Sequence, residues 1–247
     1  MSKVTVYSFC WNEKVILPHF LKHYDWADKI IIYDNYSDDG SQEIIKSHPK
    51  TELRLFDTGG YQHERLTQKI KNNCWRGDDA DWVVVCDMDE FLIGYEKLEE
   101  YKGKICAFDC TVFQVVTEEI PIDFSTVKSI YQIIRIRRRR RTRGMLRERK
   151  TICFSPKLQH IHFGLGAHVS HPIPDNKVLD AMKCYHYAAL SEDYFVNRLK
   201  SRANRILPFD LAKGRHAEYL WSEEKIREEF RRRLALTEKH EELINIH

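Results

Sequence analysis

Short apolar runs alternate with segments of helical character through the first half of the chain. The apolar runs, rich in β-branched residues, predict strands over residues 4–9, 29–33, 53–56 and 82–86. Pro18 in a first turn, Ser41 as a cap and helical spacing further on predict helices over residues 18–26, 42–47 and 61–75. Such an alternation is typical of an α/β protein with a mostly parallel central sheet flanked by helices.

Carboxylates follow two of these predicted strands directly. Asp34 comes after the strand over residues 29–33, and Asp87, Asp89 and Glu90 come after the strand over 82–86. In open α/β sheets, ligands bind outside the carboxyl ends of the strands, so these acids are expected in one crevice. Asp87 and Asp89 are two residues apart and would point to the same side, where hard oxygen ligands suit Mg²⁺ or Mn²⁺. The alternative is a solvated acidic turn without function.

Length and composition indicate one domain with an extension. The chain has 247 residues, of which 43% are hydrophobic, enough to bury a large core. We expect a domain over residues 1–215, with a nucleotide-binding half over about 1–95 and an acceptor half over about 96–215. Residues 216–247 are expected to form an amphipathic helix packed on it, because Ile226, Phe230 and Leu234 repeat at four-residue spacing within 221–243.

The seven cysteines and the hydropathy of the chain bear on its environment. The cysteines are odd in number and show no C-x-x-C spacing, so neither disulfides nor structural zinc are expected. No apolar run reaches the roughly 18–20 residues of a membrane span, and the N-terminus lacks a secretory signal pattern. These features favour a soluble cytoplasmic protein.

The positive charge is concentrated in one tract. The chain carries a net charge of +3, but residues 135–150 hold nine Arg, one Lys and one Glu, so this tract carries +9 and the remainder −6. The stretch from Arg135 to Arg143 could be a solvated or diphosphate-facing loop, a contact for an anionic acceptor or a peripheral membrane contact, or a nucleic-acid site. Nucleic acid is disfavoured by the acidic remainder and by the lack of interleaved aromatic residues.

Three motifs resemble those of one enzyme family. They are Asn12-Glu13 after the first strand, the loop over residues 33–40 that holds Asp34 and Ser37, and Asp87-Met88-Asp89-Glu90-Phe91-Leu92. The chain resembles a GT-A-fold glycosyltransferase of the family 2 type, in the branch with an Asp-x-Asp-Glu-Phe signature. Looser matches follow in the same order at Lys150-Thr-Ile, Pro156, His168 or His171, His186-Tyr187, Ser191 and Phe195.

The resemblance implies the GT-A, or nucleotide-diphospho-sugar transferase, fold and a metal-dependent glycosyltransferase. Such an enzyme moves a sugar from a UDP- or GDP-linked donor to a hydroxyl acceptor, here a glycan or another acceptor that could be anionic, with inversion as the expected outcome. It implies Mn²⁺ or Mg²⁺ held by Asp87, Asp89 and His186, with Asp87 orienting ribose or metal. The expected donor-binding residues are Asn12, Glu13, Asp34, Ser37, Arg65, Lys69, Asp87 and Met88.

The catalytic base is left open by the sequence. Glu90 lies beside the expected metal site, and Glu118 or Glu119 follows a further predicted strand over residues 112–116; Asp193 is another option. Glu90, Asp89 and Glu118 are the expected catalytic residues. Arg65, Lys69 and Asn73 share one face of the third helix and are expected either to approach the diphosphate or to form a solvated face.

Two other functions compete with glycosyl transfer. A nucleotidyltransferase acting on sugar phosphates would also place acids at strand ends, but should show a Gly-rich basic loop near the first strand, which residues 8–14 lack. A nucleic-acid-binding module would depend on the tract from Arg135 to Arg143, so its affinity would fall steeply with salt.

Overall fold

The chain divides into two compact units. The computed structural model describes residues 2–120, 132–134 and 149–239. The first unit comprises residues 1–57, 64–112 and 147–185, and the second comprises residues 58–63, 113–146 and 186–247. The expected boundary at residue 215 stays a prediction.

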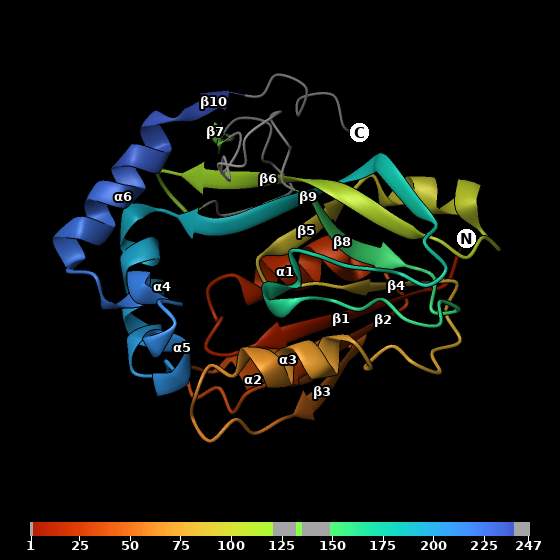
Figure 1. Cartoon of the computed structure of the whole chain (residues 1–247), viewed down its shortest axis with the longest axis horizontal. Helices are drawn as coiled ribbons and strands as arrows, with labels where there is room; N and C mark the ends of the chain where they lie inside the picture. The colour runs from red at the N-terminus through yellow and green to blue at the C-terminus, as the bar shows by residue number, and fades with distance from the viewer. Residues whose placement is uncertain (1, 121–131, 135–148, 240–247) are drawn as a thin grey trace. The chain divides into compact units, whose positions relative to one another are not determined.

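Parallel strands form the centre of the first unit. The strands β1 (Val4–Cys10), β2 (Lys29–Asp34), β3 (Thr51–Leu55) and β4 (Trp82–Val85) pair in the order β4-β1-β2-β3, and every one of these pairings is parallel. Figure 1 shows β1, β2 and β4 next to one another. Their bounds agree with the predicted strands to within two residues, and for β1, β2 and β4 the reason is that buried apolar runs between turn residues define strands well.

The remaining strands of the first unit extend this sheet. β8 (Arg149–Phe154) pairs antiparallel with β4 and with β6 (Ala107–Thr117), and β5 (Glu90–Ile93) pairs with β9 (Lys177–Leu190). The strands β6 and β9 each continue into the second unit. The fold is therefore mixed α/β with parallel strands at its centre and helices against the sheet, as predicted.

The helices of the first unit are short. They are α1 (Leu17–His23), α2 (Ser41–Ser47) and α3 (Glu64–Lys71), with 3-10 turns at Tyr24–Trp26, Tyr95–Tyr101 and Leu165–Ala167. Ser41 was expected to cap α2, but it is the first helical residue, and Gly40 takes the cap position with a φ of 97°. Glycine adopts this left-handed conformation without the steric cost of a Cβ.

The helix α3 is shorter than the helix predicted over residues 61–75. It begins only at Glu64, since Gln62 forms a bridge with Ile206 and its N–H donates to the Arg205 carbonyl at 2.7 Å. Beyond Lys71 the backbone continues as turns that end at Gly77, whose φ is 80°. Pairing with another segment thus replaces the helix at its start, and a glycine in the left-handed region closes the turns at its end.

One face of the first unit's sheet is covered by a buried aromatic and aliphatic cluster. Tyr7, Val83 and Val85 pack there with Trp75, which follows α3, and with Phe163. Burial of each large apolar side chain contributes roughly 1.5–3 kcal/mol. This packing fixes the position of α3 against the strand β4, whose end carries the acidic motif.

The second unit is mainly helical among its described residues. It contains α4 (Glu192–Ala203), α5 (Pro208–Ala212), a 3-10 turn at Ala217–Leu220 and α6 (Glu223–Ala235), with β7 (Gln132–Ile134) pairing antiparallel with β10 (Thr237–Lys239) and with the end of β6. Phe195 and Leu199 of α4 share a buried cluster with Ile226 and Phe230 of α6. The predicted four-residue apolar spacing therefore corresponds to the buried face of α6.

The last helix ends earlier than predicted. A helix over residues 221–243 was expected, but α6 begins after Ser222, whose hydroxyl accepts the Lys225 N–H at 3.3 Å, and ends at Ala235. The strand β10 follows it directly. Pairing with another strand, which local spacing does not reveal, here replaces the continued helix.

Two further findings concern the whole of the described chain. All seven cysteines are free thiols, and six of them are buried. Among the described residues no helix has both the length and the apolar character needed to cross a membrane.

Candidate functional site

The acidic motif begins where β4 leaves the sheet. The Cys86 N–H still donates to the Tyr7 carbonyl at 3.0 Å, and the next residue, Asp87, starts a turn that closes through the Glu90 N–H and the Asp87 carbonyl at 3.0 Å. The Asp87 side chain is 38% exposed, whereas Asp89 is buried. The two aspartates therefore differ in access to solvent, although they are two residues apart.

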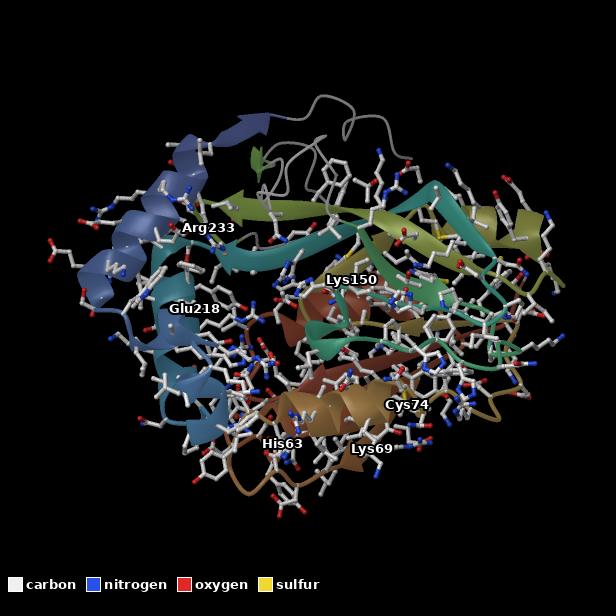
Figure 2. All side chains as sticks on the ribbon, viewed as in Figure 1. His63, Lys69, Cys74, Lys150, Glu218 and Arg233 are labelled. Carbon is white, nitrogen blue, oxygen red and sulfur yellow. The ribbon has the colours of Figure 1, made fainter. Side chains whose placement is uncertain are left out.

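Two lysines from distant segments converge on this turn. Lys71, the last residue of α3, places its Nζ 2.6 Å from Asp87 Oδ1, and Lys150, on β8, places its Nζ 3.2 Å from Asp87 Oδ2. Lys150 also pairs with Glu90 Oε1. We call these four residues, Lys71, Lys150, Asp87 and Glu90, the charge quartet. Lys150 is labelled in Figure 2.

The charge quartet is buried except at one member. The side chains of Lys71, Lys150 and Glu90 are 5%, 4% and 4% exposed, against 38% for Asp87. Buried charges are tolerated when they are paired, and here two positive charges meet two negative ones. Asp87 is therefore the point at which the buried network meets solvent.

The pairing stabilises the charged forms of Asp87 and Lys150. Burial acts to raise the pKa of Asp87, but the charges of Lys71 and Lys150 outweigh it and hold that pKa below its usual range. Burial acts to lower the pKa of Lys150, but Glu90 and Asp87 raise it above its usual range. At neutral pH Asp87 is thus a carboxylate and Lys150 an ammonium.

Hydrogen bonds to the backbone hold Glu90 in place. Its Oε2 accepts the Asp87 N–H at 3.1 Å. The hydroxyl of the fully buried Tyr24 donates to the Glu90 carbonyl and accepts the Leu92 N–H, each at 2.9 Å. Glu90 is therefore fixed at both its side chain and its main chain, which gives it a structural role whatever else it does.

Asp34 ends β2 and organises the loop that follows it. Its Oδ1 accepts the Ser37 N–H and the Gln42 side-chain amide, both at 2.9 Å, and its Oδ2 accepts the Ser37 hydroxyl at 2.5 Å. Asp34 is fully buried. Its expected contact with a nucleotide stays a prediction, because a ligand would have to use the lone pairs that these three hydrogen bonds leave available.

The loop after β1 is joined to the loop after β2 by polar contacts. Asn12 exchanges two hydrogen bonds with Asp38, at 2.7 and 3.0 Å, and its N–H donates to the Ser37 hydroxyl at 2.8 Å. The Glu13 N–H donates to the Ser41 hydroxyl at 3.2 Å. The ends of β1 and β2 thus form one ordered polar edge, and the predicted crevice shared by Asp34 and Asp87 stays a prediction.

The remaining predicted site residues have more varied positions. Arg65 and Lys69 of α3 are exposed, Met88 is buried, Glu118 is exposed directly after β6, and His186 is half-buried in β9. Lys69 is also labelled in Figure 2. His186 and Glu118 belong to the second unit, whereas the acidic motif belongs to the first. Their predicted roles stay predictions, and the arginine tract from Arg135 to Arg143 lies outside the described residues.

The acidic motif as arranged does not fit a bound divalent cation. Both oxygens of Asp87 are paired with lysines, and both oxygens of Glu90 have partners. Over residues 2–120, 132–134 and 149–239, no three His, Cys, Asp or Glu side chains converge in a way that could hold a metal ion. A cation at Asp87 would have to displace a lysine, which opposes the binding by electrostatic repulsion.

Sequence reasoning missed the partners of the acids. Lys71 lies 16 residues and Lys150 lies 63 residues from Asp87 along the chain. The sequence pointed instead to the face of α3 that carries Arg65 and Lys69. A useful signal existed in the apolar residues 152–154 that follow Lys150, because a lysine inside a buried strand requires a carboxylate partner.

Comparisons with known proteins concern the fold. No family model matches the chain, and no curated protein matches it. It is similar to a solved structure of 4-diphosphocytidyl-2C-methyl-D-erythritol synthase, with 13% identity over 63% of this chain and 76% of that one and a TM-score of 0.37. It is also similar to HddC from Yersinia pseudotuberculosis, with 14% identity over 79% of this chain and 97% of that one and a TM-score of 0.38. A third similar structure is that of a protein assigned as a glucose-1-phosphate thymidylyltransferase from Bacillus anthracis, with 13% identity over 94% of this chain and 83% of that one and a TM-score of 0.31.

These neighbours contradict the predicted glycosyltransferase. Two of the three names state an activity, and both activities are of the nucleotidyltransferase type, within the nucleotide-diphospho-sugar transferase fold that the sequence led us to expect. The prediction of glycosyl transfer is therefore wrong by this comparison, and the competing nucleotidyltransferase hypothesis agrees with it better. At identities of 13–14% and these TM-scores the likeness concerns the fold, and no residue role is taken from it.

Proposed function

We propose that the chain is a nucleotidyltransferase that acts on a sugar phosphate. One observation carries the proposal: two buried lysines converge on a single solvent-accessible carboxylate, Asp87, at the carboxyl end of a central parallel strand. Strand ends of this kind are the usual ligand site of open α/β sheets. Two ammonium groups at such a site are suited to phosphate oxygens.

The reaction joins a nucleoside triphosphate and a sugar phosphate. A phosphate oxygen of the sugar phosphate attacks the α-phosphorus, a new P–O bond forms, and the bond to the pyrophosphate leaving group breaks with its electron pair going to pyrophosphate. Negative charge grows on the leaving group, so fixed positive charge stabilises the transition state. Lys71 and Lys150 supply that charge in this proposal.

A third cation supports the same assignment. The Lys14 N–H donates to Asp39 at 2.9 Å, and its side chain lies against Gly40 at the start of α2. Lys14 is exposed and follows β1 closely, where a nucleotidyltransferase needs a phosphate-binding loop. The chain lacks a Gly-rich sequence there, so single lysines would take over the binding of phosphate.

The remaining site residues enter as proposals too. The ordered edge formed by Asn12, Ser37 and Asp34 would bind the nucleoside, since hydroxyl and amide groups there can pair with ribose and base. The Mg²⁺ or Mn²⁺ predicted from the sequence stays a prediction, since both oxygens of Asp87 are paired with lysines. No step of the proposed reaction depends on that ion.

The test is release of pyrophosphate from a panel of nucleoside triphosphates mixed with sugar 1-phosphates. We expect release that requires both substrates and falls at least about tenfold in Lys71→Met and in Lys150→Met. The matched control is Lys46→Met, an exposed lysine near the end of α2, which is expected to keep full activity. Arms with Mg²⁺, with Mn²⁺ and with chelator measure any need for metal. Absence of pyrophosphate release from every pair would refute the proposal.

A further inference from the structure

One member of the charge quartet is accessible to solvent. Lys71, Lys150 and Glu90 are at most 5% exposed, whereas the Asp87 side chain is 38% exposed and sits at the start of a turn. We propose that Asp87 occupies the position of a substrate phosphate in the ligand-free protein, and that the phosphate binds by displacing it from the two lysines. This inference rests on the proposed function, since it concerns the same site.

The contacts of Asp87 are those that an anion would make. Each of its oxygens faces a different ammonium, Oδ1 that of Lys71 at 2.6 Å and Oδ2 that of Lys150 at 3.2 Å. Two oxygens of one phosphate group can make the same pair of contacts, with a larger negative charge. The carboxylate thereby keeps two buried ammonium groups neutralised until a stronger anion arrives.

Glu90 is not exchangeable in the same way. Its side chain is 4% exposed, its Oε1 pairs with Lys150, and its Oε2 is held by the Asp87 N–H at 3.1 Å. Tyr24 fixes its carbonyl from the other side. Glu90 therefore anchors Lys150 while Asp87 moves, so one negative charge stays and one is exchanged.

A second contact holds Lys71 in place when Asp87 departs. Its Nζ lies 5.3 Å from the centroid of the Phe9 ring, within the range of a cation–π interaction. Lys71 is also the last residue of α3, and the side-chain Oδ1 of the next residue, Asn72, accepts the Phe163 N–H at 2.8 Å. The ammonium is therefore positioned by contacts that do not involve Asp87.

The displacement has a measurable consequence for anion affinity. In the present protein an incoming phosphate competes with the Asp87 carboxylate, so its apparent affinity is lowered by the stability of the internal contact. Removing the carboxylate charge removes the competitor. We expect Asp87→Asn to bind pyrophosphate about tenfold more tightly than the unmodified chain, which corresponds to about 1.4 kcal/mol.

The experiment is calorimetric titration of inorganic pyrophosphate into the full chain, with chelator present. Tighter binding by Asp87→Asn, weaker binding by Lys71→Met and unchanged binding by Lys46→Met would support the displacement. Asp87→Ala provides a second removal of the carboxylate, and circular dichroism checks that each variant is folded. Binding by Asp87→Asn and Asp87→Ala that is equal to or weaker than that of the unmodified chain, or absent from all of them, would overturn it.

The result of this titration can be distinguished from the result of the test of the proposed function. No nucleotide and no turnover are involved, so a gain of affinity in Asp87→Asn supports the displacement even when no pyrophosphate is released from any substrate pair. Conversely, a chain that releases pyrophosphate but loses anion affinity in Asp87→Asn keeps its proposed function and loses this inference.

Discussion

Replacing Lys150 by methionine tests the structural importance of the charge quartet. The change removes the ammonium but keeps most of the length of the side chain. It leaves Glu90, only 4% exposed, without its cation, whereas Asp87 keeps Lys71 at 2.6 Å and has access to solvent. Removing one partner of a buried ion pair typically costs about 3–5 kcal/mol. We therefore expect Lys150→Met to lower the free energy of unfolding by about 3–4 kcal/mol.

Urea denaturation at pH 7, followed by circular dichroism, measures this loss. The double variant Lys150→Met with Glu90→Gln removes the stranded charge as well, so it is expected to regain about 1–2 kcal/mol relative to Lys150→Met alone. Lys46→Met, on the exposed side of α2, is the control and should change stability by less than about 0.5 kcal/mol. A loss below about 1 kcal/mol in Lys150→Met, or simple additivity in the double variant, would refute the reasoning.

Three other predictions follow from neighbouring contacts. Tyr24→Phe removes the hydroxyl that bonds the Glu90 carbonyl and the Leu92 N–H, and should cost about 1–3 kcal/mol by urea denaturation; no loss would mean that water replaces it. Burial lowers the pKa of His23 to about 4, although the hydrogen bond of its ring to the Leu92 carbonyl acts to raise that pKa. As the pH falls, His23 therefore takes up a proton in the unfolded chain before it does so in the folded chain. The free energy of unfolding should thus fall from about pH 6.5 toward pH 4. His23→Gln should flatten that part of the pH profile, and an unchanged slope would contradict the assignment. The lowered pKa of Asp87 stabilises the fold above the ordinary carboxyl pKa of about 3.9, so the stability difference between the unmodified chain and Asp87→Asn should be constant from pH 5 to 8 and shrink below about pH 4.

The central strands of the sheet were predictable from sequence. Continuous apolar runs bounded by Asp34 and Asp87 leave few alternatives, because short β-branched runs of this kind between turn residues are typical of buried strands. Hydrogen bonds join the loops after β1 and β2, whereas the expected meeting of Asp34 and Asp87 in one crevice stays a prediction. Local pattern is enough here, since the determinants lie within a few residues of each other.

The chemistry of the site was harder to predict, because it depends on contacts between distant segments. Sequence spacing selected Arg65 and Lys69 on α3, yet the lysine that reaches the acidic motif is Lys71, on the side of the helix that packs inward. The carboxylates alone suggested a metal site. Their lysine partners, absent from any local motif, make Asp87 and Glu90 part of a paired charge network, and the metal site stays a prediction.

The predicted end of the last helix was wrong for a similar reason. The helix predicted over residues 221–243 follows a regular apolar spacing, but α6 ends at Ala235 and the chain continues into β10 against β7. A strand partner from elsewhere in the sequence competes with helical propensity, and the local pattern contains no information about it.

Pyrophosphorolysis tests the proposed activity most directly. In this reverse reaction a nucleoside diphosphate sugar and labelled pyrophosphate give a labelled nucleoside triphosphate and a sugar phosphate. The account predicts label in the triphosphate, with loss of that signal in Lys71→Met and retention in Lys46→Met. Release of a nucleoside diphosphate from the sugar donor without any label entering a triphosphate would contradict it.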